Sequence, residues 1–483
     1  TADRDGHDGH CRPRSGRGHR DADVGTNGPR TDHTACTRRR GRRLLRTVKL
    51  AVVVQRYGAE INGGAELHAR YVAEHLAKHA EVEVLTTCAQ DYVTWANAFD
   101  PGEDRVGDIV VRRFPVTRPR DPAKFGRLST RVFEQPHSIH HELRWLDSEG
   151  PTSPALIRHL HRRGADYDFC IFFSYRYYHA YHGCRAVAPR AVLVPTAERD
   201  PAIGLSIFGP IFRGVRAIMY NSFEERAMIQ AVSNNSDVEH TVVGVGSEIP
   251  RGSDAERFRQ KFDITGPFIL YVGRIDENKG CPELFRFFKN YASRVSRSLQ
   301  LVMIGRSILD IPAHPRIRHL GFVPDQDKFD ALAAAHALVM PSQFESLSMV
   351  ALEAWAMSRP VLANGRCDVL QGQCLRSNAG LDYTNYEEFA ETLHALETNR
   401  PLHAGLSHNG RTFFKRHYAW PVIERKYLDV LERLKGGEAK PMERLPGWFG
   451  RRRRNVAPTQ EVVDALRTGP ALKSGRPRSG RRA

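Results

Sequence analysis

Two glutamates frame a turn and the start of a helix in the stretch PSQFESLSMVALEAW, residues 341–355. Glu345 comes before the predicted helix, and Glu353 lies inside it. If the whole stretch were helical, a rise of 1.5 Å per residue would place the two carboxylates about 12 Å apart. Carboxylate pairs that hydrolyse glycosidic bonds lie about 5–9.5 Å apart. The spacing therefore favours two carboxylates that hold different parts of one long ligand, although Glu353 alone could be an ordinary helix glutamate.

Two predicted helix starts offer backbone N–H groups to an anion. One lies near Leu347 and Ser348, between the two glutamates. The other follows the first predicted strand in EINGGAELH, where Gly63 and Gly64 precede a helix. Free N–H groups and the positive end of the helix dipole suit a phosphate at such a position. For the glycine pair, a plain turn from strand to helix is the alternative.

A loop with two cations follows a later strand, in YVGRIDENKG at 271–280. The strand ends at Gly273, and Arg274 and Lys279 follow it. The planar fork of arginine and the point charge of lysine together suit a diphosphate. The alternative is a pair of solvated surface cations.

A fourth loop, VPTAERDPAIG at 194–204, places Glu198 and Asp200 directly after a buried strand. Carboxylates at this position are candidate partners for the hydroxyl groups of a reacting sugar or of its acceptor. Each of these four loops follows a short apolar run.

Short apolar runs alternate with amphipathic stretches along most of the chain, and this alternation predicts parallel sheets covered by helices on both faces. In the first half we expect a helix over 65–80 and strands over 50–57, 82–87, 168–175, 191–197, 217–222 and 240–246. The turn-rich stretch SEIPRGSD at 247–254 interrupts the pattern. The second half predicts strands over 268–274, 299–305, 317–323, 337–342 and 360–365.

The predicted fold class is therefore α/β, with two Rossmann-like, doubly wound domains that face a central cleft. In such sheets, ligands bind at the carboxyl ends of the strands. We expect an N-terminal, acceptor-side domain over 47–247 and a C-terminal, donor-side domain over 248–435 that ends in helices. The two ends, 1–46 and 436–483, are poor in aliphatic residues and are expected to be mostly disordered.

The formal charge of +17 lies mainly on these ends. Residues 1–46 carry a net +6 and residues 436–483 a net +8, which leaves +3 for 47–435. A specific nucleic-acid site would need a basic face on a folded module, and the charge distribution predicts none. The tails could still contact anionic lipid or nucleic acid without specificity.

The sequence also argues against several other classes. No apolar run approaches the roughly 18 residues that a membrane span needs, and the N-terminus lacks the apolar region of a secretory signal. The first residue is Thr, so the natural start could lie elsewhere. The eight cysteines include no CxxC pair, which is typical of a reduced protein without structural zinc. We therefore expect a cytoplasmic protein.

Three stretches together resemble a GT-B-fold, family-4-type retaining glycosyltransferase of the glycosyl transferases group 1. They are NGGAELHARYVAEHLAKHAEVEVLTT, VGRIDENKG and GFVPDQDKFDALAAAHALVMPSQFESLSMVALEAWAMSRPV, and the resemblance covers about 47–435. Within it, Glu345 and Glu353 form the E-x7-E element. The stretch DYVTWANAFDPGEDRVGDIVVRRFPV at 91–116 is similar to a bacterial subgroup that acts on surface polysaccharides.

The resemblance implies a role for each candidate residue. Arg274 and Lys279 would neutralise the diphosphate of a UDP- or GDP-sugar donor, which is the leaving group. Glu345 would hold hydroxyls of the donor sugar, and Glu353 those of the ribose. Gly63 and Gly64 would let the backbone approach the phosphates, and Phe322, after Gly321, would lie near the base.

The resemblance also implies transfer with retention of configuration, no metal and no further cofactor. Charge stabilisation by cations and helix termini would be the main catalytic term. One residue departs from the pattern, because Glu198 stands where many relatives carry a histidine. An acidic group there would contact sugar hydroxyls rather than act as a cation, which leaves the identity of the sugar open.

Two other functions remain as alternatives. One is a GT-B-fold nucleotide-sugar epimerase, which would convert the donor without an acceptor. The other is a non-catalytic protein that binds membrane or nucleic acid through its basic ends, but it leaves the four loops unexplained. For the transferase, the expected acceptor is a glycan or a lipid-linked sugar in cell-surface polysaccharide or glycolipid biosynthesis. A peripheral contact of the basic tails with the inner face of the plasma membrane is a further expectation.

Three other stretches have plain alternatives. HSIHHE at 137–142 spaces histidines as a metal pair would, but without evident further ligands. The aromatic run at 172–183 could stack on an acceptor sugar or simply pack at a strand end. GWFGRRRR at 447–454 is consistent with a membrane contact, whereas a solvated tail is the plainer interpretation.

Overall fold

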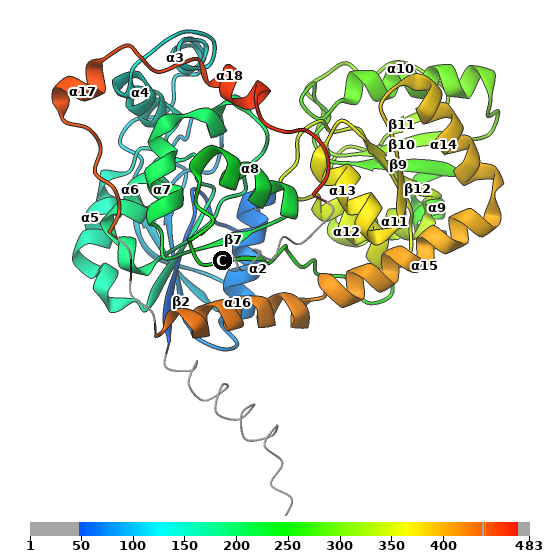
Figure 1. The fold of residues 1–483 in the computed structure, drawn as a ribbon. Helices are drawn as coiled ribbons and strands as arrows, with labels where there is room; N and C mark the ends of the chain where they lie inside the picture. Colours follow the sequence, from blue (N-terminus) through cyan, green and yellow to red (C-terminus); the bar gives the residue numbers. More distant parts are fainter. Residues whose placement is uncertain (1–47, 437–438, 440, 472–483) are drawn as a thin grey trace, which may run out of the picture. The chain divides into compact units, whose positions relative to one another are not determined.

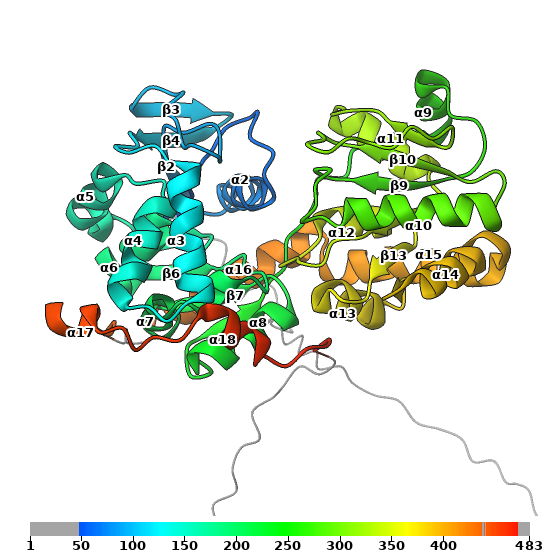
Figure 2. The same cartoon turned by 90° about the horizontal axis from the view of Figure 1, so that it is seen from above.

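A computed structural model describes residues 48–436, 439 and 441–471. Its first sheet has eight strands in the order β3-β4-β2-β1-β5-β6-β7-β8. All neighbours are parallel except β3 and β4, which pair antiparallel. The strands are β1 (Lys49–Val53), β2 (Glu81–Thr87), β3 (Gly102–Val106), β4 (Ile109–Phe114), β5 (Phe169–Phe173), β6 (Ala191–Val194), β7 (Ala217–Tyr220) and β8 (His240–Val242). Figure 2 shows β2, β4 and β3 following one another at one side of this sheet.

Helices connect these strands and cover the sheet. The first of them follows β1 directly, as the sequence predicts, but ends earlier than expected. The helices are α2 (Gly64–Leu76), α3 (Pro122–Glu134), α4 (Ile139–Glu149), α5 (Pro154–Arg163), α6 (Tyr178–Ala186), α7 (Gly209–Gly214) and α8 (Phe223–Ser233), with short 3-10 turns η1 (Gly164–Asp166), η2 (Ala188–Arg190), η3 (Pro201–Gly204) and η4 (Ser206–Phe208).

The second sheet has six strands in the order β11-β10-β9-β12-β13-β14, all parallel. Its elements occupy the second half of the colour scale in Figure 1. The strands are β9 (Phe268–Val272), β10 (Gln300–Ile304), β11 (Ile317–His319), β12 (Ala337–Met340), β13 (Val361–Asn364) and β14 (Gly380–Tyr383). The helices are α9 (Ala255–Phe262), α10 (Cys281–Arg294), α11 (Asp325–Ala334), α12 (Met349–Ala356), α13 (Asp368–Ser377), α14 (Tyr386–Thr398) and α15 (Arg400–His417).

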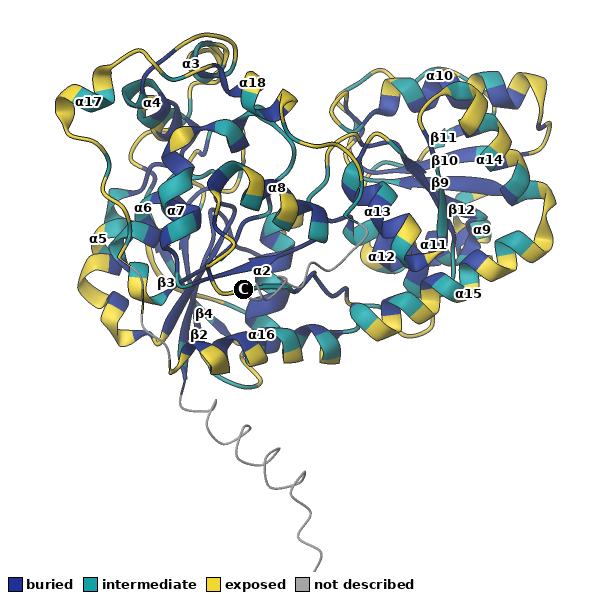
Figure 3. Cartoon of the chain, viewed as in Figure 1, coloured by how far each residue is buried: buried dark blue, intermediate teal, exposed yellow. Residues whose placement is uncertain are grey.

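Every residue of the central strands β5, β6 and β12 is buried, because helices cover both faces of each sheet. Figure 3 shows the same contrast, with dark-blue strands beneath helices that are partly yellow. The prediction of two parallel-sheet domains is therefore confirmed. The antiparallel β3 was not expected. Within the described residues, no helix is long and apolar enough to cross a membrane.

The chain after the second sheet returns to the first. Helix α16 (Trp420–Leu434) packs against α2 and β8, although we expected this segment to belong to the C-terminal domain. Two further helices follow, α17 (Trp448–Arg452) and α18 (Thr459–Asp464). They contact α4 and η3 respectively, and the red segment that carries them runs along the first sheet's helices (Figure 1).

The expectation of disorder over 436–483 is wrong for residues 441–471. Leu445 packs against the core of the first sheet, and Val463 is buried there. A few well-placed apolar side chains thus hold a segment whose overall composition is typical of disorder. The predicted tail 1–46 and the end of the chain, 472–483, lie outside the described residues.

Candidate active site

The strand order of the second sheet decides which loops meet. The chain passes from β9 outward to β11 and then returns to β12, which pairs with β9 on its other side. The loops after β9 and β12 therefore leave the sheet side by side at its carboxyl edge. Ligands of doubly wound sheets bind at such a reversal of strand order. These are the loops that carry Arg274, Lys279 and Glu345.

Lys279 and Glu345 form an ion pair across this reversal. The Lys279 Nζ donates to the Glu345 Oε1 at 2.8 Å, and both side chains are partly buried. Burial alone would lower the pKa of Lys279, but the carboxylates of Glu345 and Glu198 outweigh it and raise the pKa to about 12. Lys279 therefore remains a cation held at a fixed position, as the binding of a diphosphate requires.

Asp276 holds the two cations of this loop and is not indicated by the sequence pattern. Its buried carboxylate accepts a hydrogen bond from the Lys279 backbone N–H at 2.8 Å and a second one from the Arg274 Nε. The Arg274 Nη1 also donates to the Tyr92 hydroxyl at 2.6 Å. Tyr92 belongs to the loop after β2, so Arg274 contacts a loop that joins strands of the first sheet.

Glycines allow the backbone to come close at this edge. A Cβ on Gly305 would lie 1.9 Å from the Gly273 carbonyl oxygen. Gly280, the N-cap of α10, has a φ of +72°, and a Cβ there would lie 2.3 Å from the Pro341 oxygen. Side chains at these positions would separate the loops after β9, β10 and β12, so these glycines keep Lys279 near Glu345.

Glu198, in the loop after β6, is an electrostatic neighbour of the same pair. Burial raises the pKa of Glu198 to about 7; Lys279 opposes the rise, while Glu345 and Asp200 add to it. A carboxyl group with this pKa is partly protonated near neutral pH. It can therefore donate as well as accept a hydrogen bond, unlike an ordinary glutamate.

The backbone beside Glu198 is fixed by a buried glutamate on α8. The Glu225 Oε1 accepts a hydrogen bond from the Ala197 N–H at 2.6 Å, and its Oε2 accepts one from the Asn221 N–H at 2.5 Å. On the other side, Arg199 pairs with Asp368 of α13 at 2.8 Å. Both neighbours of Glu198 are thus anchored, and Glu225 was not among the residues that the sequence indicated.

Replacing Glu198 by glutamine is expected to stabilise the protein in alkaline buffer. The folded protein keeps a proton on Glu198 up to a pKa of about 7, above the ordinary value of 4.5. Stability is therefore lost as the pH rises through this window, since the folded state binds more protons there than the unfolded chain. We expect the Tm of Glu198→Gln to exceed that of the wild type at about pH 8 and the difference to shrink at about pH 5.

A pH series of thermal unfolding measures this difference. Glu391→Gln, an exposed glutamate on α14, is the matched control and should follow the wild type throughout. Equal shifts for Glu198→Gln at both pH values would contradict a raised pKa at Glu198.

Glu353 lies apart from this pair, in the first turns of α12. The Ser348 side chain caps that helix by accepting a hydrogen bond from the Ala351 N–H at 3.2 Å. Glu353 is buried, and its Oε1 accepts a hydrogen bond from the Lys328 Nζ at 3.1 Å. Its Oε2 has no hydrogen-bond partner among the described residues. The two carboxylates of the E-x7-E element thus have different partners, and one buried oxygen of Glu353 has no hydrogen-bond partner among the described residues.

The remaining candidates are placed as follows. Leu347, just before the cap, is buried. Phe322 is 62% exposed next to Gly321, which has a φ of +71°. Gly63 is the N-cap of α2 and Gly64 its first residue. The structure therefore pairs Lys279 with Glu345, places Glu198 within electrostatic reach of both, and links Arg274 to the Lys279 backbone through Asp276.

Gly63 has a local requirement that the sequence did not show. A Cβ there would lie 2.2 Å from the Glu66 Oε2. Glu66 is buried and accepts hydrogen bonds from the Arg56 guanidinium at 2.6 and 2.8 Å. The start of α2 thus carries an internal ion pair, while Gly64 faces open space.

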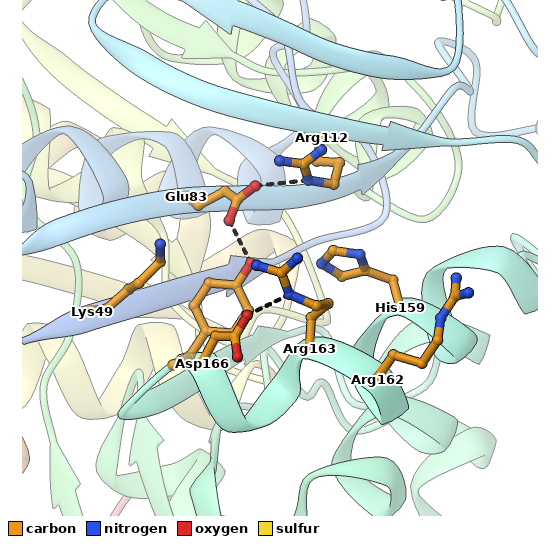
Figure 4. Close-up of a pocket in the computed structure, with 8 residues that line it drawn as sticks. Lys49, Glu83, Arg112, His159, Arg162, Arg163 and Asp166 are labelled. Carbon is orange, nitrogen blue, oxygen red and sulfur yellow. Dashed lines mark hydrogen bonds and ion pairs between the residues drawn. The ribbon is translucent and has the colours of Figure 1, made fainter.

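A cavity of about 440 Å³ lies in the first sheet's domain, near the start of β1. Figure 4 shows Lys49, Arg112, Arg162 and Arg163 around it, with Glu83 between Arg112 and a tyrosine. Lys49 pairs with Glu81, Arg112 with Glu83, and Arg163 with Asp166. Because the cavity is near the start of β1 and most of its cations are paired, we do not assign the reaction to it.

Metal-ligating side chains do not gather at the site. In the part of the chain that the structure describes, no group of three or more His, Cys, Asp or Glu side chains could hold a metal ion. His137 of the suggested histidine pair instead bonds Glu142 at 2.9 Å inside the first sheet's helical cover.

Comparison with known proteins matches part of the chain to one family. Residues 253–413 match the model for glycosyl transferases group 1. Mannosylfructose-phosphate synthase of Agrobacterium fabrum is 24% identical over 212 residues, 38% of this chain and 47% of that protein. The capsular polysaccharide biosynthesis glycosyltransferase CapM of Staphylococcus aureus is 25% identical over 224 residues, 41% and 57% of the two chains. The chain spans about half the length of these curated relatives.

Solved structures show the fold. HepE of Anabaena, in a complex with UDP and glucose, has a TM-score of 0.57 at 16% identity and is covered over its full length by 80% of this chain. Sucrose-phosphate synthase of Thermosynechococcus elongatus has the same TM-score at 14% identity, with 80% and 99% covered. These likenesses confirm the GT-B fold that the sequence predicts.

Proposed function

We propose that this chain, in which residues 253–413 form a glycosyl transferases group 1 domain, transfers a sugar from a nucleoside diphosphate sugar to a hydroxyl group of an acceptor. The observation that carries this proposal is the Lys279–Glu345 ion pair at the strand reversal, with Glu198 as its third charged neighbour. A cation and two carboxylates of different basicity form a site for a diphosphate joined to a polyol. A pocket for an apolar ligand would not need these three charged side chains.

The donor diphosphate would lie against Lys279 and Arg274. This position is at the carboxyl edge of the second sheet, beside the start of α12. As the bond between the sugar C1 and the phosphate oxygen breaks, negative charge grows on the leaving diphosphate, and the two cations stabilise it. The acceptor oxygen forms the new bond to C1, and its proton passes to the leaving phosphate. Attack on the face that the leaving group vacates would retain the anomeric configuration, without a carboxylate nucleophile.

Each carboxylate would contact a different part of the donor. Glu345, fixed by Lys279, would accept hydrogen bonds from the sugar hydroxyls. Glu353 would use its unpartnered Oε2 for the ribose. Glu198, with a pKa of about 7, could donate a proton to a sugar or acceptor oxygen. Phe322, largely exposed, would stack on the base.

We propose no metal and no cofactor besides the donor, because Arg274 and Lys279 supply the charge that a divalent cation supplies elsewhere. The acceptor would be a glycan or a lipid-linked sugar, as in the biosynthesis of surface polysaccharide or glycolipid. The name of CapM, a capsular polysaccharide biosynthesis glycosyltransferase, supports this class of product. The working place would be the cytoplasm or the inner face of the plasma membrane.

Thermal unfolding with UDP, GDP and ADP tests the donor site. A nucleotide at about 100 times its Kd should stabilise the fold by about 2.7 kcal/mol, which a thermal scan detects readily. UDP is the first to test, since HepE was solved with UDP. We expect one nucleotide to raise the Tm and Lys279→Ala to abolish the shift.

The product then separates the possible reactions. The donors to test are sugars linked to the nucleotide that raises the Tm. We expect an α-linked donor to give a product with a new α-linkage, and we expect the same product in the presence of EDTA. Donor converted without an acceptor would indicate an epimerase instead. No shift with any nucleotide would contradict the donor site itself.

A further inference from the structure

Helix α17 presents two aromatic side chains to solvent. Trp448 is 64% exposed and Phe449 is 70% exposed. Single exposed apolar residues are normal on a protein surface, but two adjacent large rings are not explained by chance exposure alone. Phe322 and Ile308, similarly exposed, lie in separate loops of the second sheet.

The chain on both sides of α17 is fixed to the first sheet's domain. Before the helix, Leu445 packs against the apolar core. After it, the backbone of Val456 exchanges two hydrogen bonds with His137, at 2.9 and 3.1 Å. The helix itself contacts α4. The rings are therefore held outward by a pinned segment, and the interpretation of 447–454 as a solvated tail does not describe it.

The surroundings of these rings are strongly basic. Residues 444–458 contain five arginines and no acidic residue. Arg452 lies over the Trp448 ring at 4.6 Å, and Arg453 over the Phe449 ring at 5.7 Å. Burial, together with Arg452, Arg144 and Arg451, lowers the pKa of His140 at the start of α4, so these cations also gather over that helix.

Aromatic rings beside arginines are the side chains that enter the interface of an anionic bilayer. The rings occupy the boundary between headgroups and acyl chains, while the guanidinium groups bind lipid phosphates. A nucleic acid would also attract the arginines, but it would leave two adjacent outward rings without an apolar partner in a duplex. We propose that α17 is a membrane-docking element that inserts Trp448 and Phe449 into an anionic lipid surface.

Helix α4 connects this element to the site. At its far end, about 16 Å along the helix, Glu149 pairs with Arg176 at 2.8 Å. Arg176 in turn pairs with Asp200, two residues from Glu198. Docking through α17 would thus place the acceptor-side loops near the lipid surface. This consequence rests on the proposed function and assigns it a lipid-linked acceptor, whereas the docking itself does not require turnover.

Trp448 provides its own probe. The chain has five tryptophans, and the other four, Trp95, Trp145, Trp355 and Trp420, are buried. Vesicles of equal parts phosphatidylglycerol and phosphatidylcholine should shift the emission of the full-length protein to the blue. Lipids brominated near the headgroup end of the acyl chain should quench it. Phosphatidylcholine vesicles alone should do neither.

Variants separate docking by α17 from attraction to the charged tails. Trp448→Ala with Phe449→Ala should lower the vesicle partition constant about tenfold or more, since two rings lose their apolar environment. Single changes to Gln at positions 451–454 should each lower the vesicle partition constant about fivefold. High salt should remove this effect. Ile308→Ala, an equally exposed apolar residue in a loop of the second sheet, is the matched control and should bind like the wild type.

Three outcomes would overturn the proposal. The first is an absence of binding to anionic vesicles by the wild type. The second is unchanged binding by the double aromatic variant, which would assign binding to the tails. The third is an equal emission shift with duplex DNA and no quenching by brominated lipid. The Tm of the double aromatic variant is also measured with the nucleotide. A Tm shift in this variant would show that its donor site is intact, so a loss of vesicle binding is not a loss of the donor site.

Discussion

Lys279→Ala is expected to lower the turnover of donor by about 10²–10³-fold while leaving the protein folded. The ammonium group pairs with Glu345 and interacts electrostatically with Glu198, so its removal leaves two carboxyl groups where the proposed diphosphate would bind. The charge that grows on the leaving group would then face repulsion instead of attraction. The loss should appear in kcat as well as in donor affinity, because the interaction strengthens as the bond breaks. Steady-state kinetics with saturating acceptor measure both.

A second lysine provides the matched control. Lys261 pairs with Asp327 at 2.8 Å, the same distance as in the Lys279 pair, but on α9 and α11 away from the strand reversal. Lys261→Ala should change turnover by less than about twofold, since exposed ion pairs contribute little. Circular dichroism and the Tm show whether both variants fold. Wild-type turnover in Lys279→Ala would remove that residue from the mechanism.

Glu353→Gln is expected to raise the Kd of the donor nucleotide about 10–100-fold, because hydrogen bonds to a charged carboxylate are worth about 1.5–3 kcal/mol each. The glutamine keeps the shape of the side chain and still accepts the hydrogen bond from Lys328. A contact to the ribose is made equally in the bound donor and in the transition state. The value of kcat at saturating donor should therefore change little. Isothermal calorimetry with the nucleotide gives the Kd.

Nucleotides without ribose hydroxyls test this role directly. The wild type should bind the 2′,3′-dideoxy nucleotide about as weakly as Glu353→Gln binds the normal one, and the variant should lose little more with the dideoxy form. Equal affinity of the wild type for both nucleotides would place Glu353 elsewhere in the ligand. An unchanged Kd in the variant would leave its unpartnered Oε2 without this explanation.

The sequence places Lys279 and Glu345 after apolar runs, but their proximity depends on the strand order, which the alternation of strands and helices leaves open. In the structure β9 and β12 are neighbours, and this brings Lys279 and Glu345 into an ion pair. Each is found from its type and its place after an apolar run. The same reasoning placed Glu198 after a strand of the other sheet, but its pKa depends on neighbours that no local pattern shows.

The supporting residues could not be predicted in this way. Asp276, Glu225 and Lys328 act through contacts between segments 25 or more residues apart, or through a single backbone N–H, and their types are common at surface positions. The strand β14 was missed since its four residues, GLDY, show neither a run nor an alternation of apolar side chains. The segment 441–471 was misjudged because composition averages over few anchoring residues, of which Val463 is the clearest.

The return of the chain to its first sheet also affects how the protein forms on the ribosome. The last strand of that sheet ends at Val242, while α16, which covers α2 and β8, begins about 180 residues later at Trp420. Translation at about 5–20 residues per second separates the two events by roughly 10–40 s. Throughout that time the nascent chain displays an apolar face, which includes Tyr71, without its own cover. That face is therefore a natural place for a ribosome-associated chaperone to bind until α16 has been synthesised and covers it.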